Sequence, residues 1–556
     1  MALWKSMVAV LMSCGMLVSS VLAHDSSPSE RAPAEASAAV PLYDDLGNLT
    51  YPITTNSPLA QRYFDQGLRL TYAFNHDEAR RAFHEAQRHD PQCAICYWGE
   101  AFVLGPNINA PMDEAAGSPA VASITKAKAL APGARAREQA LIHALSTRYT
   151  EDPKAERAVL NRAYAEAMTA ATQRFPDDTE IAVLYIDSIM NLSPWDYWEA
   201  DGTTPKGQIG DAIKTAERVL ATHPDHPGAI HLYIHLTEAS TTPERAEPYA
   251  NRLAALMPGA GHIVHMGSHT FFRIGRYQDS VEANKTAVSV DEAYLARARA
   301  EGIYAYGYYP HNIHFVMVSA QMTGDGKTAL EYAQRLEGKI PEAIVEKVGL
   351  AQPIKVAPYF VHAQFSAPGT ILALPDPGDK FPFIKAMWHY ARGVARAAQG
   401  NIEQAESEAA RIAELHQKAD FSSLLAWAIP APDLLQLARH VVEGRIAVAQ
   451  GDTARAVKEF EVAVSIQDAI AYMEPPYWYY PVRQSLGAAL LAAGKPAEAE
   501  QAFQQSLKQF PHNGWALYGL MHAQQAQHHE AAAQETTKRF KQAWTGDAAT
   551  LTLKRL

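Results

Sequence analysis

The chain has 556 residues and a formal net charge of −11 at neutral pH. An acidic chain without a long run of Lys or Arg argues against nucleic acid or an anionic membrane surface as its partner. The sequence also lacks a phosphate-binding glycine loop, a dinucleotide-binding glycine pattern and a Gly-x-Ser-x-Gly elbow. Nucleotide chemistry and serine hydrolysis are therefore unsupported.

The first 23 residues are typical of a secretory signal peptide. Lys5 precedes an apolar run that ends in Val-Leu-Ala at Ala23, and such a segment is removed on export. Lipidation at Cys14 is the less favoured alternative, because the apolar run continues beyond that residue. No later stretch reaches the ~18 uninterrupted apolar residues of a membrane span. We therefore predict a secreted or periplasmic protein without a membrane span, with a Ser-, Ala- and Pro-rich flexible leader over residues 24–55.

Helical repeats follow the leader. One unit has the order Gly-x4-Tyr, Ala-x3-Phe, Ala and Pro, at Gly67, Tyr72, Ala79, Phe83, Ala86 and Pro91. A second unit near the C-terminus has Gly487, Gly494, Ala499, Phe503 and Pro511. On these residues the chain resembles the tetratricopeptide repeat family. The resemblance implies an all-α solenoid of helical hairpins, wound as a right-handed superhelix with loop insertions, over residues 56–545, followed by a C-terminal tail over 546–556.

Cys93 and Cys96 are the cysteines that remain once the signal peptide is removed. In an oxidising compartment a C-x-x-C pair most simply forms a local disulfide, which is the favoured interpretation. Metal ligation and thiol redox chemistry are the alternatives. If Cys93 and Cys96 face the groove of the solenoid, Glu100 does so as well.

Histidine is enriched in one part of the chain. Nine of the 22 histidines lie between His223 and His314, where an even distribution would place about four. Eight polar residues fall into three short groups with spacings of three or four, so that each group occupies one side of a helix. These groups are His231, His235 and Glu238; His262, His265 and His269; and His311 and His314.

The resemblance to tetratricopeptide repeats implies that all eight of these side chains point into the concave groove. Histidine is a common ligand of transition metals, and seven histidines at matching positions predict a metal site, possibly dinuclear. The predicted ligands are His231, His235, His262, His265, His269, His311 and His314. Glu238 is the predicted catalytic residue, as general base or as a further ligand. Copper is favoured over zinc or iron, because the site is rich in imidazole and poor in carboxylate.

Aromatic residues near the histidines are candidates for the walls of a substrate site. The predicted substrate-binding residues are Trp195, Trp198, Tyr309, Tyr480 and Arg483, of which Arg483 could hold a carboxylate or phosphate. Core packing is the alternative for each aromatic side chain.

The leading hypothesis is a metal-dependent, copper-type oxidoreductase that acts on a small organic substrate in the groove. One alternative is a scaffold that binds a peptide or protein, or delivers metal, without turnover. Another is a zinc-dependent hydrolase that uses the same residues. A solvent-open site would favour delivery, whereas a site sealed by the loop insertions would favour catalysis.

Overall fold

The computed structural model describes residues 40–152, 154–298 and 302–556. The predicted signal peptide and most of the predicted leader lie outside these residues. Residues 42–556 form one compact unit, and the described residues contain helices and isolated bridges but no strand. The predicted all-α fold is therefore confirmed.

The N-terminal third of the unit contains eight helices. They are α1 (Pro58–Tyr72), α2 (His76–His89), α3 (Ala94–Val103), α4 (Gly117–Leu130), α5 (Ala136–Ser146), α6 (Arg157–Arg174), α7 (Thr179–Met190) and α8 (Ile209–Thr222). The middle of the chain contains α9 (Pro227–Glu238), α10 (Glu247–Leu256), α11 (Gly261–Arg273), α12 (Tyr277–Ala298), α13 (Tyr309–Thr323), α14 (Gly326–Leu336), α15 (Glu342–Lys347), α16 (Ala351–Phe365) and α17 (Pro368–Leu372).

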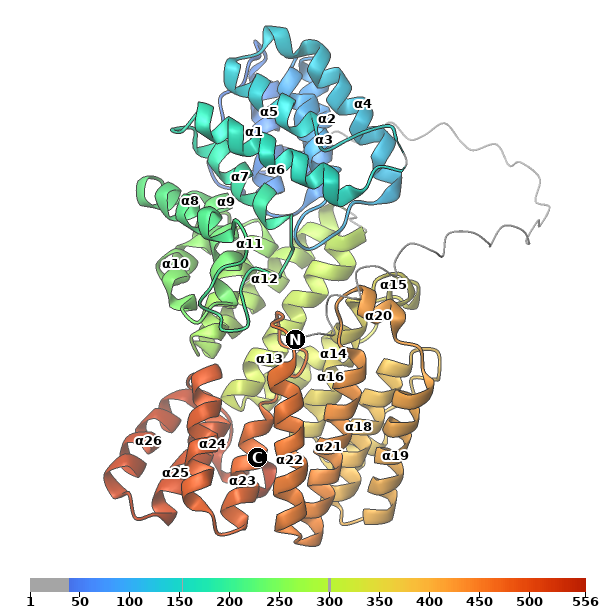
Figure 1. Cartoon of the computed structure of the whole chain (residues 1–556), viewed down its shortest axis with the longest axis vertical. Helices are drawn as coiled ribbons and strands as arrows, with labels where there is room; N and C mark the ends of the chain where they lie inside the picture. Colours follow the sequence, from blue (N-terminus) through green and yellow to red (C-terminus); the bar gives the residue numbers. More distant parts are fainter. Residues whose placement is uncertain (1–39, 153, 299–301) are drawn as a thin grey trace, which may run out of the picture. The chain divides into compact units, whose positions relative to one another are not determined.

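The C-terminal third contains α18 (Pro382–Ala398), α19 (Ile402–Lys418), α20 (Ser422–Ala426), α21 (Ala431–Gln450), α22 (Thr453–Ala469), α23 (Val482–Ala492), α24 (Pro496–Gln509), α25 (Gly514–Ala526) and α26 (Glu530–Ala543). Helices that follow one another along the chain pack as pairs, such as α1 with α2, α11 with α12 and α25 with α26 (Figure 1). Each pair shares its apolar side with the next one, as in a helical repeat array.

Two phenylalanines show why the repeat pattern carries glycine at fixed positions. A Cβ atom on Gly67 or Gly99 would lie 2.6 or 2.5 Å from the Phe83 ring, so α1 and α3 can close on α2 only without side chains there. Gly487 and Gly519 flank Phe503 in the same way, with a Cβ at 2.6 or 2.1 Å from the ring. The same packing thus recurs near both ends of the array.

The two predicted flanking segments are more ordered than we expected from their composition. Tyr51 and Ile53 are buried, and their backbone N–H groups donate to Asp65 at 3.0 Å and to Gln61 at 2.9 Å. These residues of the predicted leader therefore pack against α1. Likewise, Leu551 and Leu556 of the predicted C-terminal tail are buried against the array.

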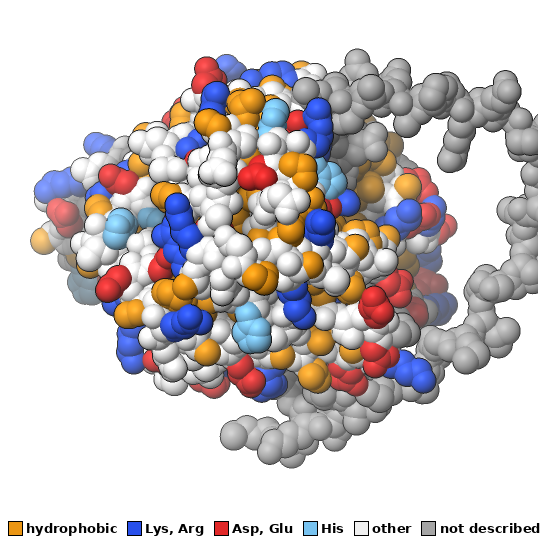
Figure 2. All heavy atoms as spheres, turned by 90° about the horizontal axis from the view of Figure 1, so that it is seen from above, with side chains coloured by type: hydrophobic (Ala, Val, Ile, Leu, Met, Phe, Trp, Pro, Cys, Tyr) orange, Lys and Arg blue, Asp and Glu red, His pale blue; other side chains and the backbone are white. Residues whose placement is uncertain are grey.

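The surface of the unit carries mixed charge. In the view of Figure 2, basic and acidic side chains alternate over the visible face without a continuous basic stripe. Among the described helices, none combines the length and the apolar character that crossing a membrane requires.

Candidate metal centre

Three helices that pack against one another hold the histidines. Every residue of α9 is buried, and this helix begins at Pro227 with the His226 side chain accepting from the Ala229 N–H at 3.1 Å. Pro at the first helical position and a side-chain cap are strong start signals. Because α9 contacts α11, and α11 contacts α13, the imidazoles on these helices face one another.

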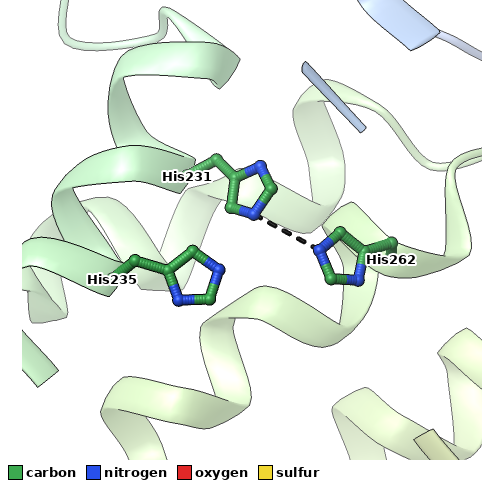
Figure 3. A group of neighbouring side chains, drawn as sticks. All are labelled: His231, His235 and His262. Atoms are coloured by element: carbon green, nitrogen blue, oxygen red, sulfur yellow. Dashed lines mark hydrogen bonds between the residues drawn. The ribbon is translucent and has the colours of Figure 1, made fainter. Parts of the chain in front are cut away.

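The first triad consists of His231, His235 and His262 (Figure 3). One nitrogen from each ring lies within 4.8 Å of the other two, and Nε2 of His262 is 3.3 Å from Nε2 of His231. Two imidazole nitrogens bound to one metal at ~2.0–2.1 Å with tetrahedral angles lie about 3.3 Å apart. The spacing of this pair therefore fits shared coordination of one ion.

The second triad consists of His265, His269 and His311, again with one nitrogen from each ring within 4.8 Å of the others. Nε2 of His265 lies 2.7 Å from Nε2 of His269 and 3.2 Å from Nε2 of His311. The His235 and His269 ring centroids are 5.1 Å apart. The two triads are thus neighbours, as a dinuclear site requires.

Four of the imidazole rings have a hydrogen-bond acceptor at Nδ1, the nitrogen that faces away from the other rings. The Nδ1 atom of His231 lies 2.7 Å from the Tyr72 carbonyl oxygen, and that of His265 lies 2.6 Å from Oδ1 of Asn284. Nδ1 of His235 and Nδ1 of His269 each lie 2.6 Å from a Glu238 oxygen. Since these oxygens accept, the Nδ1 atoms carry the protons, and each Nε2 directs a lone pair toward the other rings. Imidazole binds metal in this tautomer.

Burial keeps most of these imidazoles neutral. Burial, followed by the neighbouring histidines, holds the pKa values of His262, His265 and His311 well below the ordinary histidine value. The pKa of His269 is raised instead, because its attraction to Glu238 and Glu474 outweighs its burial. Nε2 of His235 and Nδ1 of His262 are buried without a hydrogen-bond partner among the described residues. Converging unprotonated nitrogens repel one another unless a cation lies between them, so the donor set fits metal ions.

Glu238 links the two triads. Its Oε1 accepts from His235 of the first triad and its Oε2 from His269 of the second. The Tyr472 hydroxyl also donates to Glu238, at 3.1 Å. A carboxylate that holds the Nδ1 side of metal-binding histidines orients the rings and raises their basicity. The geometry therefore suits Glu238 to a positioning role. The predicted roles of ligand or general base stay predictions, and His235, Glu238 and His269 also form a group that could hold a metal ion.

Residues from distant parts of the chain cover the first triad. The Phe74 ring lies 4.4 Å from His231, and the Tyr308 ring lies 4.5 Å from His262, between ring centroids. Trp195 lies 5.2 Å from His235 and donates from Nε1 to the carbonyl oxygen of Ile108 at 3.0 Å. Phe74 and Trp195 both have positive φ, 53° and 66°, a conformation that is uncommon for aromatic residues and is held here by the surrounding packing.

The second triad is covered by Phe315 and by the loop before α23. The Phe315 ring centroid lies 4.9 Å from that of His265 and 5.1 Å from that of His269. In the loop, the Tyr472 hydroxyl also contacts Glu474, and Glu474 lies 3.8 Å from Nδ1 of His269. Sequence reasoning missed Phe74, Asn284, Phe315, Tyr472 and Glu474. Of these, only Tyr472 and Glu474 carried a signal, because they immediately precede the aromatic motif around Tyr480.

His314 was predicted as a ligand, but it does not join either triad. Its ring packs edge-on against Tyr479, with 5.7 Å between centroids, and both ring nitrogens are buried without a described partner. Burial lowers the pKa of His314 to about 3. A separation of three residues rotates His314 by about 60° from His311 around the helix axis, which places it on the side of α13 that faces Tyr479.

Of the predicted substrate-binding residues, the structure brings only Trp195 against a histidine ring. Trp198 donates to the Leu236 carbonyl at 2.9 Å, and Tyr309 donates to Glu292 at 2.7 Å. The Tyr480 hydroxyl contacts Ser485 and the Leu556 carbonyl oxygen, which lie outside the triads. Arg483 forms an ion pair with Asp468, so its charge is already neutralised.

Cys93 and Cys96 form a disulfide, and neither belongs to a histidine triad. Glu100 lies one turn beyond Cys96 and bonds to His84, Gln87 and Arg80. These contacts belong to the packing of α2 against α3. The expectation that Glu100 faces the histidine groove is thus not supported by its hydrogen bonds.

Replacing Glu100 with glutamine is expected to make stability less dependent on acid pH. Burial alone would raise the pKa of Glu100, but hydrogen bonds from His84 and Gln87 outweigh it and lower the pKa from 4.5 to about 2. The stabilising effect of the carboxylate is therefore complete above pH 4.5 and is lost as the pH falls toward 2. We expect Glu100→Gln to cost about 1–3 kcal/mol at pH 7 and progressively less below pH 4.5.

Denaturant unfolding at several pH values between 3 and 7 measures this difference. Glu498→Gln is the matched control, because Glu498 is exposed and pairs with Lys495 on the surface. A constant deficit of the Glu100 variant across the whole pH range would contradict the prediction.

The repeat pattern is recognised independently of the site. Residues 490–548 match the sequence model described as tetratricopeptide repeat. The matched segment contains α24, α25 and α26. No curated protein matches its sequence.

Solved structures that match along most of the chain share little sequence identity with it. The human IFIT1 dimer with m7Gppp-AAAA is 12% identical, with 88% of this chain and 90% of that chain covered and a TM-score of 0.33. Yeast Tom70 is 12% identical, with 87% and 91% covered and a TM-score of 0.28. The predicted resemblance to tetratricopeptide repeats is confirmed for residues 490–548 by the sequence model.

Proposed function

We propose that this helical-repeat protein is exported and holds a dinuclear transition-metal centre that oxidises a small organic substrate. One observation carries the proposal: six histidines from three helices form two adjacent triads, and one carboxylate bonds to a histidine of each. Three imidazoles per ion leave at least one position open on each metal, which is the arrangement of a catalytic rather than a purely structural site.

Copper is the favoured metal. The triads offer imidazole nitrogens only, while the nearby carboxylate of Glu238 is engaged by two Nδ1–H groups. Such a donor set suits copper or zinc and is poor for magnesium or calcium, and among divalent ions copper binds nitrogen ligands most tightly. Export to an oxidising compartment would also suit a redox-active copper centre.

The burial of the triads favours catalysis over metal delivery. His231, His235, His262, His265 and His269 are at most 2% exposed, and His311 is half-buried. The first triad is covered by aromatic residues from the turn before α2, from the loop before α8 and from the π-helical turn before α13. Rapid exchange of an ion would require these residues to move. The burial therefore argues against metal delivery, while a scaffold that binds a peptide elsewhere on the array stays an alternative.

The proposed chemistry is a two-electron oxidation. The two triads would hold two neighbouring ions, which would supply one-electron redox chemistry when bound. The substrate would lose two electrons and two protons, and dioxygen would accept them to give hydrogen peroxide. Glu238 would hold one ring of each triad in the metal-binding tautomer, and the covering aromatic side chains would exclude water from the site.

Two measurements test the proposal. Elemental analysis of the mature protein gives its metal content, and dioxygen uptake is measured with a panel of phenols, alcohols and amines. The comparison is the triple variant His231→Ala/His265→Ala/His311→Ala. About two copper ions per chain, lost in the variant together with substrate-dependent dioxygen uptake, would support the proposal. Zinc with hydrolytic activity and no dioxygen uptake would overturn it in favour of the hydrolase alternative. A protein that binds neither copper nor zinc would support the alternative of a scaffold without turnover.

A further inference from the structure

A cavity of about 220 Å³ lies between the end of α11 and the loop that precedes α23. Its walls include the aromatic side chains of Phe272, Tyr472, Tyr477, Trp478 and Phe510. An apolar cavity of about 150 Å³ is large enough to bind benzene. This cavity therefore has room for one aromatic ring with a small substituent.

Arg273 places a positive charge at the wall of the cavity. Its Nε donates to the Glu238 carbonyl oxygen at 2.7 Å, and one terminal nitrogen donates to the Ser240 carbonyl oxygen at 3.1 Å. The guanidinium also lies over the Tyr472 ring, 5.3 Å from its centroid. Among the residues that the structure describes, Arg273 forms no ion pair with a carboxylate. Its charge is held in place by two neutral oxygens and remains available to an anion.

Arg483 shows the contrasting case nearby. It pairs with Asp468, which also lines the cavity. The cavity wall thus contains one cation without a carboxylate partner, while the adjacent charged pair is internally balanced. A ligand that combines an aromatic ring with a single negative charge would complement both the walls and Arg273.

Tyr472 connects this cavity to the candidate metal centre. Its ring forms part of the wall, while its hydroxyl donates to Glu238 at 3.1 Å and also contacts Glu474. Glu238 in turn bonds to one histidine of each triad. A molecule in the cavity would lie on one side of the Tyr472 side chain, with the carboxylate that positions the triads at its hydroxyl end.

We propose that the cavity binds a small aromatic carboxylate, with the ring between the aromatic walls and the carboxylate on Arg273. That this ligand is the substrate rests on the function proposed above; the binding itself does not. A bidentate pair between Arg273 and the carboxylate supplies orientation as well as affinity, and places the ligand against Tyr472.

Calorimetric titration of the metal-loaded protein tests the proposal. The ligands are benzoate and its neutral analogue benzamide. We expect benzoate to bind at least about tenfold more tightly than benzamide, because a hydrogen-bonded charge pair contributes about 1.5–3 kcal/mol. Arg273→Gln should remove this preference. The control Arg483→Gln/Asp468→Asn removes the neighbouring ion pair with both of its charges. It should keep the benzoate affinity within about threefold of the wild-type value.

A second variant guards against a general loss of structure. Because Arg273 contacts the end of α9, its replacement could disturb the triads. Metal content and unfolding temperature are therefore measured for each variant. The titrations are also repeated on the metal-free proteins. Tyr477→Ala removes part of the aromatic wall and should weaken both ligands about equally. Equal affinities for benzoate and benzamide, or an Arg273→Gln variant that keeps the preference, would overturn the proposal. Benzoate binding to a protein that takes up no metal would overturn the metal centre and leave the cavity assignment standing.

Discussion

Replacing His231 and His262 together with alanine is expected to lower the copper content from about two ions per chain to about one. These two histidines supply two of the three nitrogens of the first triad, and one remaining imidazole, His235, holds an ion too weakly to retain it through purification. The second triad shares no ligand with the first, so its ion should remain. The reciprocal variant His265→Ala/His311→Ala is expected to lose the other ion.

Elemental analysis after dialysis against a mild chelator measures the stoichiometry of both variants. His314→Ala is the matched control, because His314 is a buried histidine on the same helix as His311 but packs against Tyr479 instead of the triads. It should retain about two ions. Loss of an ion from the His314 variant, or full metal content in either triad variant, would show that the ions are not held by the triads as grouped here.

Substitution of Glu238 by glutamine should weaken the binding of one of the two ions about 10- to 100-fold, even though it preserves the shape of the side chain. The carboxylate accepts from Nδ1 of His235 and from Nδ1 of His269 at 2.6 Å each. An amide offers only one accepting oxygen, so its NH₂ group must face one of the two rings. That ring would have to move its proton to Nε2 and could then no longer bind metal through that atom. Glu238→Ala should be at least as damaging.

Competition with a chelator of known affinity measures this loss ion by ion. Glu100→Gln is the matched control, since Glu100 is also a buried carboxylate that bonds to a histidine but lies outside the triads. Its metal affinity should be that of the wild type. Unchanged affinity in Glu238→Gln would mean that Glu238 does not orient the rings, and would return it to the role of general base.

Local patterns were sufficient to predict the helices and most of the histidines that the structure brings together. The spacing of Gly67, Phe83 and Ala86 predicted a helical hairpin, because small residues must lie where neighbouring helices approach closely. Six of the seven predicted ligand histidines lie in the triads. His314 is the exception. Its position in the repeat defines the direction of its side chain around α13 only approximately, and in the structure the ring faces Tyr479 instead of the triads.

The grouping of the histidines could not be predicted from their positions along the chain. Along the sequence, His262 belongs with His265 and His269, which follow it on the same helix. In the structure, His262 joins His231 and His235, while His265 and His269 join His311. The division follows from how α9, α11 and α13 cross, which is set by packing among many residues outside the motifs.

By itself, the sequence of this protein determined an all-α repeat array with imidazoles concentrated on three successive groove-facing helices. This information is local, because helix periodicity and residue type need no knowledge of distant contacts. Only the tertiary structure decided that two triads form, that Glu238 serves both of them, and that Arg273 rather than Arg483 is the cation without a carboxylate partner. Each of these depends on distances between residues far apart in the chain, and those distances are set by close packing of side chains across helices.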